Sequence, residues 1–228
     1  MNRGVEDSYK VTYDITLICF IIISVLLLSS GNPTLAADAA NLPPAKGGKL
    51  PAISLPIPKD SDEKTYLGLS GEGLFKITQL KTKGILIKIF NLYCPICQST
   101  ASAMAEMHHR IENNPDLKNR IKLIGIGVGN NALETEVFKQ TYHIPFPIFP
   151  DENFKIHKVL GEVRTPFFIA VKMNGDGSAD VVHTHLGGLT DARGFLDLMV
   201  EAYGIKQEDL LTKQAGSSPI EPSSAMVP

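Results

Sequence analysis

An apolar stretch that ends in a pair of cysteines constrains the fold of this chain more than any other feature. Residues 85–90 read Ile-Leu-Ile-Lys-Ile-Phe, and Cys94 and Cys97 follow after a short gap. A run of this kind, rich in β-branched residues, predicts a strand that is buried in a sheet. Apolar side chains then recur at helical spacing between 98 and 112, so the cysteine pair is expected where the strand gives way to a helix.

The start of a helix is a favourable place for thiol chemistry. Its unpaired backbone N–H groups and its dipole stabilise an anion, which favours the thiolate form of Cys94. Cys97 lies one turn further into the helix. Pro95 fits the first turn, because no backbone donor is needed there. The spacing therefore predicts that Cys94 is the attacking thiol and Cys97 the resolving one.

Two other uses of a cysteine pair stay open on the residues alone. A zinc site needs four ligands. The remaining cysteine, Cys19, lies in an N-terminal apolar run, and neither a second cysteine pair nor a His-x3-His motif follows. A structural disulfide is the other alternative. We favour redox chemistry over both and expect no metal at this site.

Length and charge favour a single globular domain. The chain has 228 residues, of which 43% are hydrophobic, and its formal net charge is −2. This composition is sufficient for a proper core and carries no bulk positive charge that would attract nucleic acid. We therefore expect a soluble protein that does not bind nucleic acid.

The first 40 residues have the pattern of a targeting segment. The apolar run Ile15–Leu28 has the length of the hydrophobic region of a signal peptide, and the alanine-rich stretch 36–40 offers small residues for cleavage. The residues before the run include acidic side chains, so an uncleaved N-terminal anchor is the alternative. We expect export to the periplasm or another extracytoplasmic compartment. If the segment is not cleaved, it would tether the protein to the membrane.

The rest of the chain divides into three parts. Residues 41–63 are rich in proline and lack periodicity, which predicts an extended linker. Residues 64–204 form the expected domain, and 205–228 form a Ser- and Pro-rich flexible tail. Within the domain, strands are expected at 121–128, 167–172 and 179–185, helices at 131–143, 154–160 and 190–202, and an extended crossing at 145–151.

This order of elements resembles the thioredoxin superfamily, over about 50–203. Within it, the chain is most similar to the exported TlpA/ResA-like thiol-disulfide oxidoreductases, next to the redoxin group. The motifs that carry the resemblance are Cys94-Pro95-Ile96-Cys97 and Thr165-Pro166-Phe167-Phe168. The resemblance implies an α/β, three-layer fold, with a central mixed sheet and helices on both faces.

The resemblance also implies an activity. The protein would exchange disulfides with protein thiols, including a membrane-bound or exported redox partner, and would need no cofactor. Pro166 would be a cis-proline that faces the cysteines, and Thr165 would offer its backbone to a substrate beside Tyr93 and Pro95. On the residues alone, Pro166 is equally an ordinary trans-proline that starts a strand.

Three residues depart from the family pattern. Tyr93 stands where the family usually has Trp, and it can keep the aromatic packing near the sulfur. Lys88 occupies the position of the buried acid of thioredoxin. Asn91 replaces the Thr that precedes a peroxidatic cysteine, which disfavours the second candidate, a redoxin-type peroxidase. A thioredoxin-fold binding module with a structural disulfide is the third candidate.

Lys88 itself has two interpretations. Its stem could pack while its ammonium reaches water at a sheet edge. Alternatively, the charge lies near the cysteine pair, where it stabilises a thiolate and makes the couple more oxidising. The two-residue period of a strand places Lys88 on the same face as Leu86 and Phe90, toward the cysteine helix.

Overall fold

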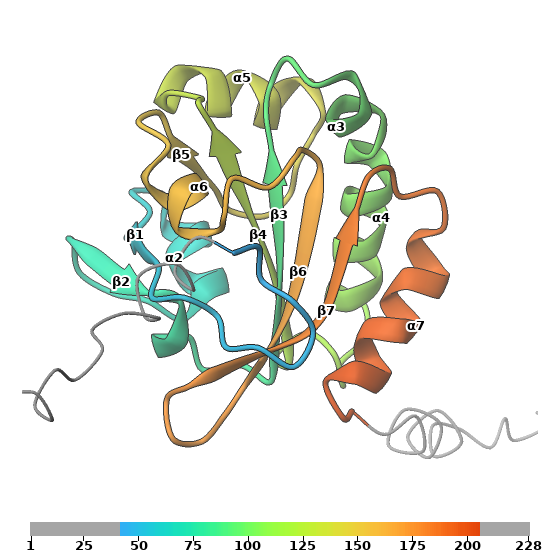
Figure 1. The fold of residues 1–228 in the computed structure, drawn as a ribbon. Coiled ribbons are helices and arrows are strands. Elements are labelled where there is room, and N and C mark those ends of the chain that lie inside the picture. The colour runs from blue at the N-terminus through green and yellow to red at the C-terminus, as the bar shows by residue number, and fades with distance from the viewer. Residues whose placement is uncertain (1–41, 206–228) are drawn as a thin grey trace, which may run out of the picture. The chain divides into compact units, whose positions relative to one another are not determined.

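A computed structural model describes residues 42–205 of the chain (Figure 1). The predicted targeting segment at 1–40 and all but the first residue of the predicted tail lie outside the described residues. Within the described part, no helix combines the length and the apolar character that crossing a membrane requires.

A mixed five-stranded sheet forms the centre of the domain, in the order β5-β4-β3-β6-β7. Strands β3, β4 and β5 are parallel, whereas β6 is antiparallel to β3 and β7 is antiparallel to β6. The bounds are β3 (Gly84–Phe90), β4 (Ile121–Val128), β5 (Ile148–Asp151), β6 (Phe167–Met173) and β7 (Ala179–Leu186).

Helices cover both faces of this sheet (Figure 1). One face carries α3 (Pro95–Ser99), α4 (Ala101–Glu112), α5 (Ala132–Thr141) and α7 (Ala192–Ala202). The other carries α2 (Ser61–Leu67), α6 (Lys155–Val159), the short 3-10 helix η2 (Ile77–Gln79) and a small sheet of β1 (Ser54–Pro56) and β2 (Leu74–Lys76). The predicted α/β architecture, with a mixed sheet between two helical layers, is confirmed.

Strand β3 lies in the middle of the sheet, and all of its residues are buried. Side chains alternate between the two faces of a strand. The three isoleucines of β3 pack with β1 and β2, whereas Leu86 and Phe90 pack with α4 and α7. The face that the sequence predicted for Lys88 is therefore the face of the cysteine helix.

The extended segment predicted at 41–63 packs with the domain, and its last residues begin α2. Strand β1 pairs antiparallel with β2, and Asp60 caps the N-terminus of α2. Leu50, Ile53 and Leu55 are buried in the core. The prolines of this segment favour extended backbone. Its apolar residues are too few to show a period, so the sequence pattern did not predict that they are buried against the domain.

Three smaller differences concern element boundaries. The predicted crossing at 145–151 contains β5, whose prolines are tolerated because β5 is an edge strand. The cysteine helix begins at Pro95, as its place in the first turn predicted, but it is interrupted at Thr100. Helix α7 is capped by Asp191, which accepts the Gly194 N–H, and not by the expected Thr190.

We predict that Leu55→Ala destabilises the domain, because the side chain of Leu55 is fully buried in the core formed with β3. The free energy of unfolding should fall by about 3 kcal/mol, as for other buried leucines. Urea unfolding measures this change. The matched control is Leu74→Ala in the paired strand β2, because Leu74 is 72% exposed and should change stability by less than about 0.5 kcal/mol. Equal effects of both substitutions would contradict the placement of β1 in the core.

Candidate active site

The cysteine pair lies just beyond the C-terminal end of β3, at the start of α3. Cys94 is the N-cap residue of α3 and is partly exposed, whereas Cys97 is buried inside the helix. Both cysteines are free thiols. The Cys97 N–H donates a hydrogen bond to Cys94 Sγ over 3.2 Å, so the predicted position of Cys94 at a helix start is confirmed.

The two thiols differ in acidity. Partial burial opposes ionisation of Cys94, but hydrogen bonds from the Cys97 thiol and the surrounding backbone outweigh it, and the pKa of Cys94 is lowered. Burial, together with the hydrogen bond to Cys94, raises the pKa of the Cys97 thiol to about 12. The exposed sulfur is therefore the one that forms a thiolate, and the buried one stays protonated.

The Thr-Pro motif lies against the first cysteine. The Thr165-Pro166 peptide bond is cis, and the Cys94 thiol donates to the Thr165 carbonyl over 3.6 Å. The Pro166 carbonyl accepts the Gly187 N–H over 2.9 Å, which links it to the end of β7. The two motifs that are far apart in sequence thus meet at one place.

Three polar residues that the sequence analysis did not assign to the site fix the loop between β3 and Cys94. Asn130 Oδ1 accepts the Leu92 N–H over 2.8 Å, and Gln98 Nε2 donates to the Leu92 carbonyl over 2.8 Å. Asn91 donates to the Val128 carbonyl and accepts the N–H of the residue two positions on. The sequence did contain one signal for these residues: Asn91 and Asn130 lie one and two residues after the ends of the neighbouring strands β3 and β4.

Tyr93, the residue that precedes Cys94, is exposed and hydrogen-bonded to a neighbouring helix. Its side chain is 69% exposed, and its hydroxyl donates to Glu134 Oε1 over 2.6 Å. Tyr93 therefore connects the cysteine loop to α5. Pro95 and Ile96 are also exposed beside Cys94, which leaves an apolar surface around the partly exposed sulfur.

Lys88 is buried next to the pair, so the interpretation as a residue that reaches water is wrong. Its exposed fraction is 2%. Lys88 Nζ donates to the Cys97 carbonyl and to Thr100 Oγ1, both over 3.1 Å. Burial lowers the pKa of Lys88 to about 8, while the neighbouring cysteine charges act in the opposite direction.

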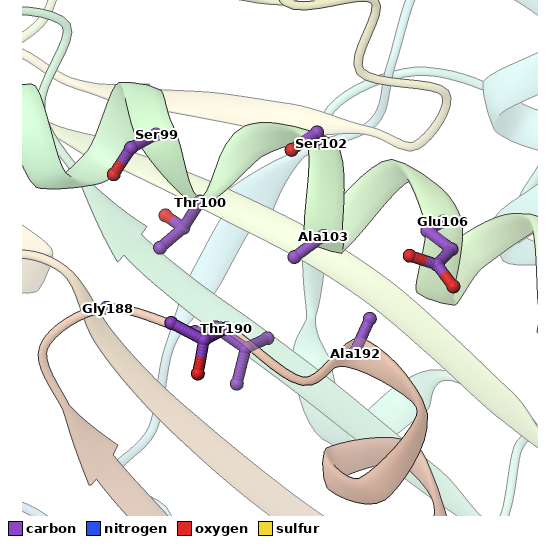
Figure 2. A pocket seen from close by; sticks show the side chains of 9 residues that line it. Ser99, Thr100, Ser102, Ala103, Glu106, Gly188, Thr190 and Ala192 are labelled. Carbon is purple, nitrogen blue, oxygen red and sulfur yellow. The ribbon is translucent and has the colours of Figure 1, made fainter.

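A groove runs beside the cysteine helix (Figure 2). Its volume is about 390 Å³. Thr100, Ala103 and Glu106 contribute to one wall, and Gly188, Thr190 and Ala192 to the other. A methyl group at Gly188 would lie 3.6 Å from Ile96 Cγ2, so the groove adjoins the cysteine motif.

Potential metal ligands are not clustered in the described range. Between residues 42 and 205, no three His, Cys, Asp or Glu side chains are grouped closely enough to hold a metal ion. The zinc alternative for the cysteine pair would need further ligands of this kind.

We predict that Lys88→Met stabilises the reduced protein, because an ammonium is costly to bury. One pKa unit is worth ~1.4 kcal/mol, so a shift from 10.5 to about 8 corresponds to roughly 3 kcal/mol at pH 7. The unfolded chain binds this proton more tightly than the folded one. The loss of stability caused by the buried ammonium is therefore complete below pH 8, and it disappears as the pH rises to 10.5.

Urea unfolding of both reduced proteins across this pH range measures the difference. The advantage of Lys88→Met should be largest at neutral pH and should shrink in alkali. A variant that is less stable than the wild type at pH 7 would contradict a net cost of burying the Lys88 ammonium.

Comparisons with known proteins show which proteins this chain is similar to. No family model matches the chain. Over 123 residues the chain is 23% identical to the thiol-disulfide oxidoreductase ResA from Halalkalibacterium halodurans. The match covers 54% of this chain and 64% of ResA, so the chain spans just under two thirds of the length of that curated relative.

Two solved structures show the same fold. A Chlorobium tepidum protein assigned as the thiol:disulfide interchange protein DsbE superposes with a TM-score of 0.54 at 17% identity, covering 71% of this chain and 99% of that one. A secreted thiol-disulfide isomerase from Corynebacterium glutamicum gives a TM-score of 0.50 at 14% identity, covering 68% and 85%. The chain is a thioredoxin-fold protein, similar to the ResA-like thiol-disulfide oxidoreductases.

Proposed function

We propose that the chain is a thiol-disulfide oxidoreductase that exchanges disulfides with protein partners through Cys94 and Cys97. The observation that carries this proposal is the asymmetry of the pair. Cys94 is accessible, accepts the Cys97 N–H and has a lowered pKa, whereas Cys97 is buried and has a raised pKa. A structural disulfide needs no such difference between its two sulfurs.

The reduced pair would act in two steps. The Cys94 thiolate attacks a substrate disulfide, which forms a mixed disulfide and releases one substrate thiolate. Cys97, as a thiolate, then attacks Cys94 Sγ, which forms the internal disulfide and releases the second substrate thiolate. Two electrons pass from the pair to the substrate, and the oxidised form accepts electrons by the same steps in reverse.

The surface around Cys94 suits a polypeptide substrate. Thr165 already offers its carbonyl to the Cys94 thiol, and its backbone lies where a bound chain could pair with it. Tyr93 and Pro95 are exposed and complete the proposed contact surface, whereas Pro166, which the sequence analysis also expected there, is buried. The groove of Figure 2 extends this surface along α4 and supplies hydroxyl groups for a polar chain.

The peroxidase alternative is less well supported. Its motif would need a hydroxyl at position 91, but Asn91 is engaged with the backbone of β4 and of the cysteine loop. No feature of the described residues favours a binding module with a structural disulfide over a redox-active pair.

We also propose that the protein works outside the cytoplasm. The predicted targeting segment at 1–40 and the description of a structural neighbour as secreted support this location. A membrane-bound or exported redox partner would then reoxidise or reduce the pair. N-terminal sequencing of the protein from its native envelope would distinguish cleavage near the alanine cluster from an uncleaved anchor, and a start at Met1 would exclude cleavage.

The roles of the two cysteines can be tested by trapping. The reduced Cys97→Ser variant should accumulate a mixed disulfide with oxidised insulin, because Cys94 can attack but nothing resolves the adduct. The matched Cys94→Ser variant should accumulate little or none. Non-reducing electrophoresis with mass spectrometry measures the adduct. Equal trapping by both variants, or by neither, would contradict the assigned roles.

A further inference from the structure

Lys88 is an unusual side chain for the middle of a central strand. Together with Asp151 it is one of two charged residues that are buried among the described residues. Asp151 accepts hydrogen bonds from the Ile156 and His157 N–H groups at the start of α6. Lys88 instead donates to the Cys97 carbonyl and to the Thr100 hydroxyl, at the point where α3 gives way to α4 beside the cysteines.

The two hydrogen bonds of Lys88 can be made by a neutral amine as well as by an ammonium. An ammonium has three donors, whereas a neutral amine has two donors and one lone pair. Lys88 Nζ makes two hydrogen bonds, to the Cys97 carbonyl and to Thr100 Oγ1. The Thr100 hydroxyl can give its own hydrogen to the Ile96 carbonyl, 3.0 Å away. In the neutral form both N–H groups are therefore used, and one lone pair remains to accept a proton.

The surroundings of Lys88 supply no carboxylate within the described part of the chain. Its neighbours in the sheet are Gly125 on β4 and Phe168 on β6, and the ring of Phe138 on α5 lies 5.6 Å away. The titratable groups that act on it are Cys97 and Cys94, both at the cysteine helix. The charge of Lys88 is thus balanced only when one of these two sulfurs is a thiolate.

We propose that the Lys88 amine accepts the proton of the Cys97 thiol when Cys97 resolves the mixed disulfide. This inference rests on the proposed function. It gives Cys97 a base, which that residue needs because its thiol is buried and has a raised pKa.

The proton balance follows the two steps of exchange. In the reduced protein a Cys94 thiolate faces the Lys88 ammonium. When Cys94 forms the mixed disulfide, the ammonium loses its counter-charge and gives its proton to the released substrate thiolate or to water. The neutral amine then takes the Cys97 proton, and the Cys97 thiolate attacks Cys94 Sγ. The second substrate thiolate leaves, and Lys88 loses its proton again beside the uncharged disulfide.

Electrostatics support this order of events. Burial already lowers the pKa of Lys88, and the attraction of the Cys94 charge partly opposes that effect. Formation of the mixed disulfide removes this attraction, which leaves the amine neutral, and it also removes the Cys94 hydrogen bond and charge that raise the pKa of Cys97. The same lysine can therefore stabilise the attacking thiolate first and act as a base for Cys97 afterwards.

The experiment separates the two steps with 5,5′-dithiobis(2-nitrobenzoate) as the disulfide. Stopped-flow absorbance records release of the first thionitrobenzoate, which reports attack by Cys94, and of the second, which reports attack by Cys97. In Lys88→Met we expect the second phase at pH 7 to be slower by about 100-fold, the usual scale of general base catalysis. The first phase should change far less.

The pH profile provides a second readout. In the wild type, the rate of the second phase should level off once Lys88 is neutral. In Lys88→Met it should keep rising with pH, because Cys97 then ionises without a base. Lys88→Arg keeps the charge but cannot lose its proton, so it should be as slow as Lys88→Met. A fast second phase in Lys88→Arg would overturn proton transfer and assign Lys88 a purely electrostatic role.

Lys122→Met is the matched control. Lys122 lies on the adjacent strand β4, is partly buried with a lowered pKa, and packs over the ring of Tyr66 away from the cysteines. Both phases should be unchanged in this variant. A second phase of wild-type rate in Lys88→Met would overturn the role of Lys88 as a base but would leave the proposed function standing. A wild-type protein without a rapid first phase would overturn the proposed function, and the inference with it.

Discussion

Burial of β3 on both of its faces is the constraint on which the rest of the structure depends. The strand lies between β4 and β6, and it separates a core shared with the cysteine helix from a core shared with the β1–β2 sheet. Its end fixes where the cysteine loop begins. Because side chains alternate along a strand, the same burial that directs Leu86 and Phe90 toward α4 also directs Lys88 toward the cysteines.

The chemistry follows from what this arrangement does to two similar thiols. The helix start exposes Cys94 and gives it a hydrogen-bond donor, whereas one further turn buries Cys97. Burial alone would make Cys97 a slow nucleophile. A buried lysine near this sulfur is costly for folding, and its retention in the centre of the sheet is understandable if it serves the reaction.

The elements that depend on short sequence patterns could be predicted from the sequence. The long apolar runs predicted β3 and β4 directly, and the helix expected from residue 131 is α5, which begins with a capping box of Asn131 and Glu134. The contact between Cys94 and Thr165 depends on the pairing of β3 with β6, which only the family resemblance suggested.

Other features depend on tertiary contacts that no short pattern contains. β1 is only a few residues long and is stabilised by its pairing with β2 and by the burial of Leu55. The exposure of Tyr93 follows from its hydrogen bond to Glu134, which lies far along the chain. For Lys88 the sequence predicted correctly which face of the sheet the side chain lies on. How deeply it is buried depends on its contacts with Phe138 and Thr100.

The reduction potential of the Cys94/Cys97 couple tests the central claim most directly. It can be measured by equilibrating the protein in glutathione buffers, blocking free thiols by alkylation, and counting the blocked cysteines by mass. The account predicts one two-electron transition between about −270 and −120 mV, the range of thioredoxin-like oxidoreductases. A potential below about −300 mV, typical of a structural disulfide, or the absence of any internal disulfide, would contradict it.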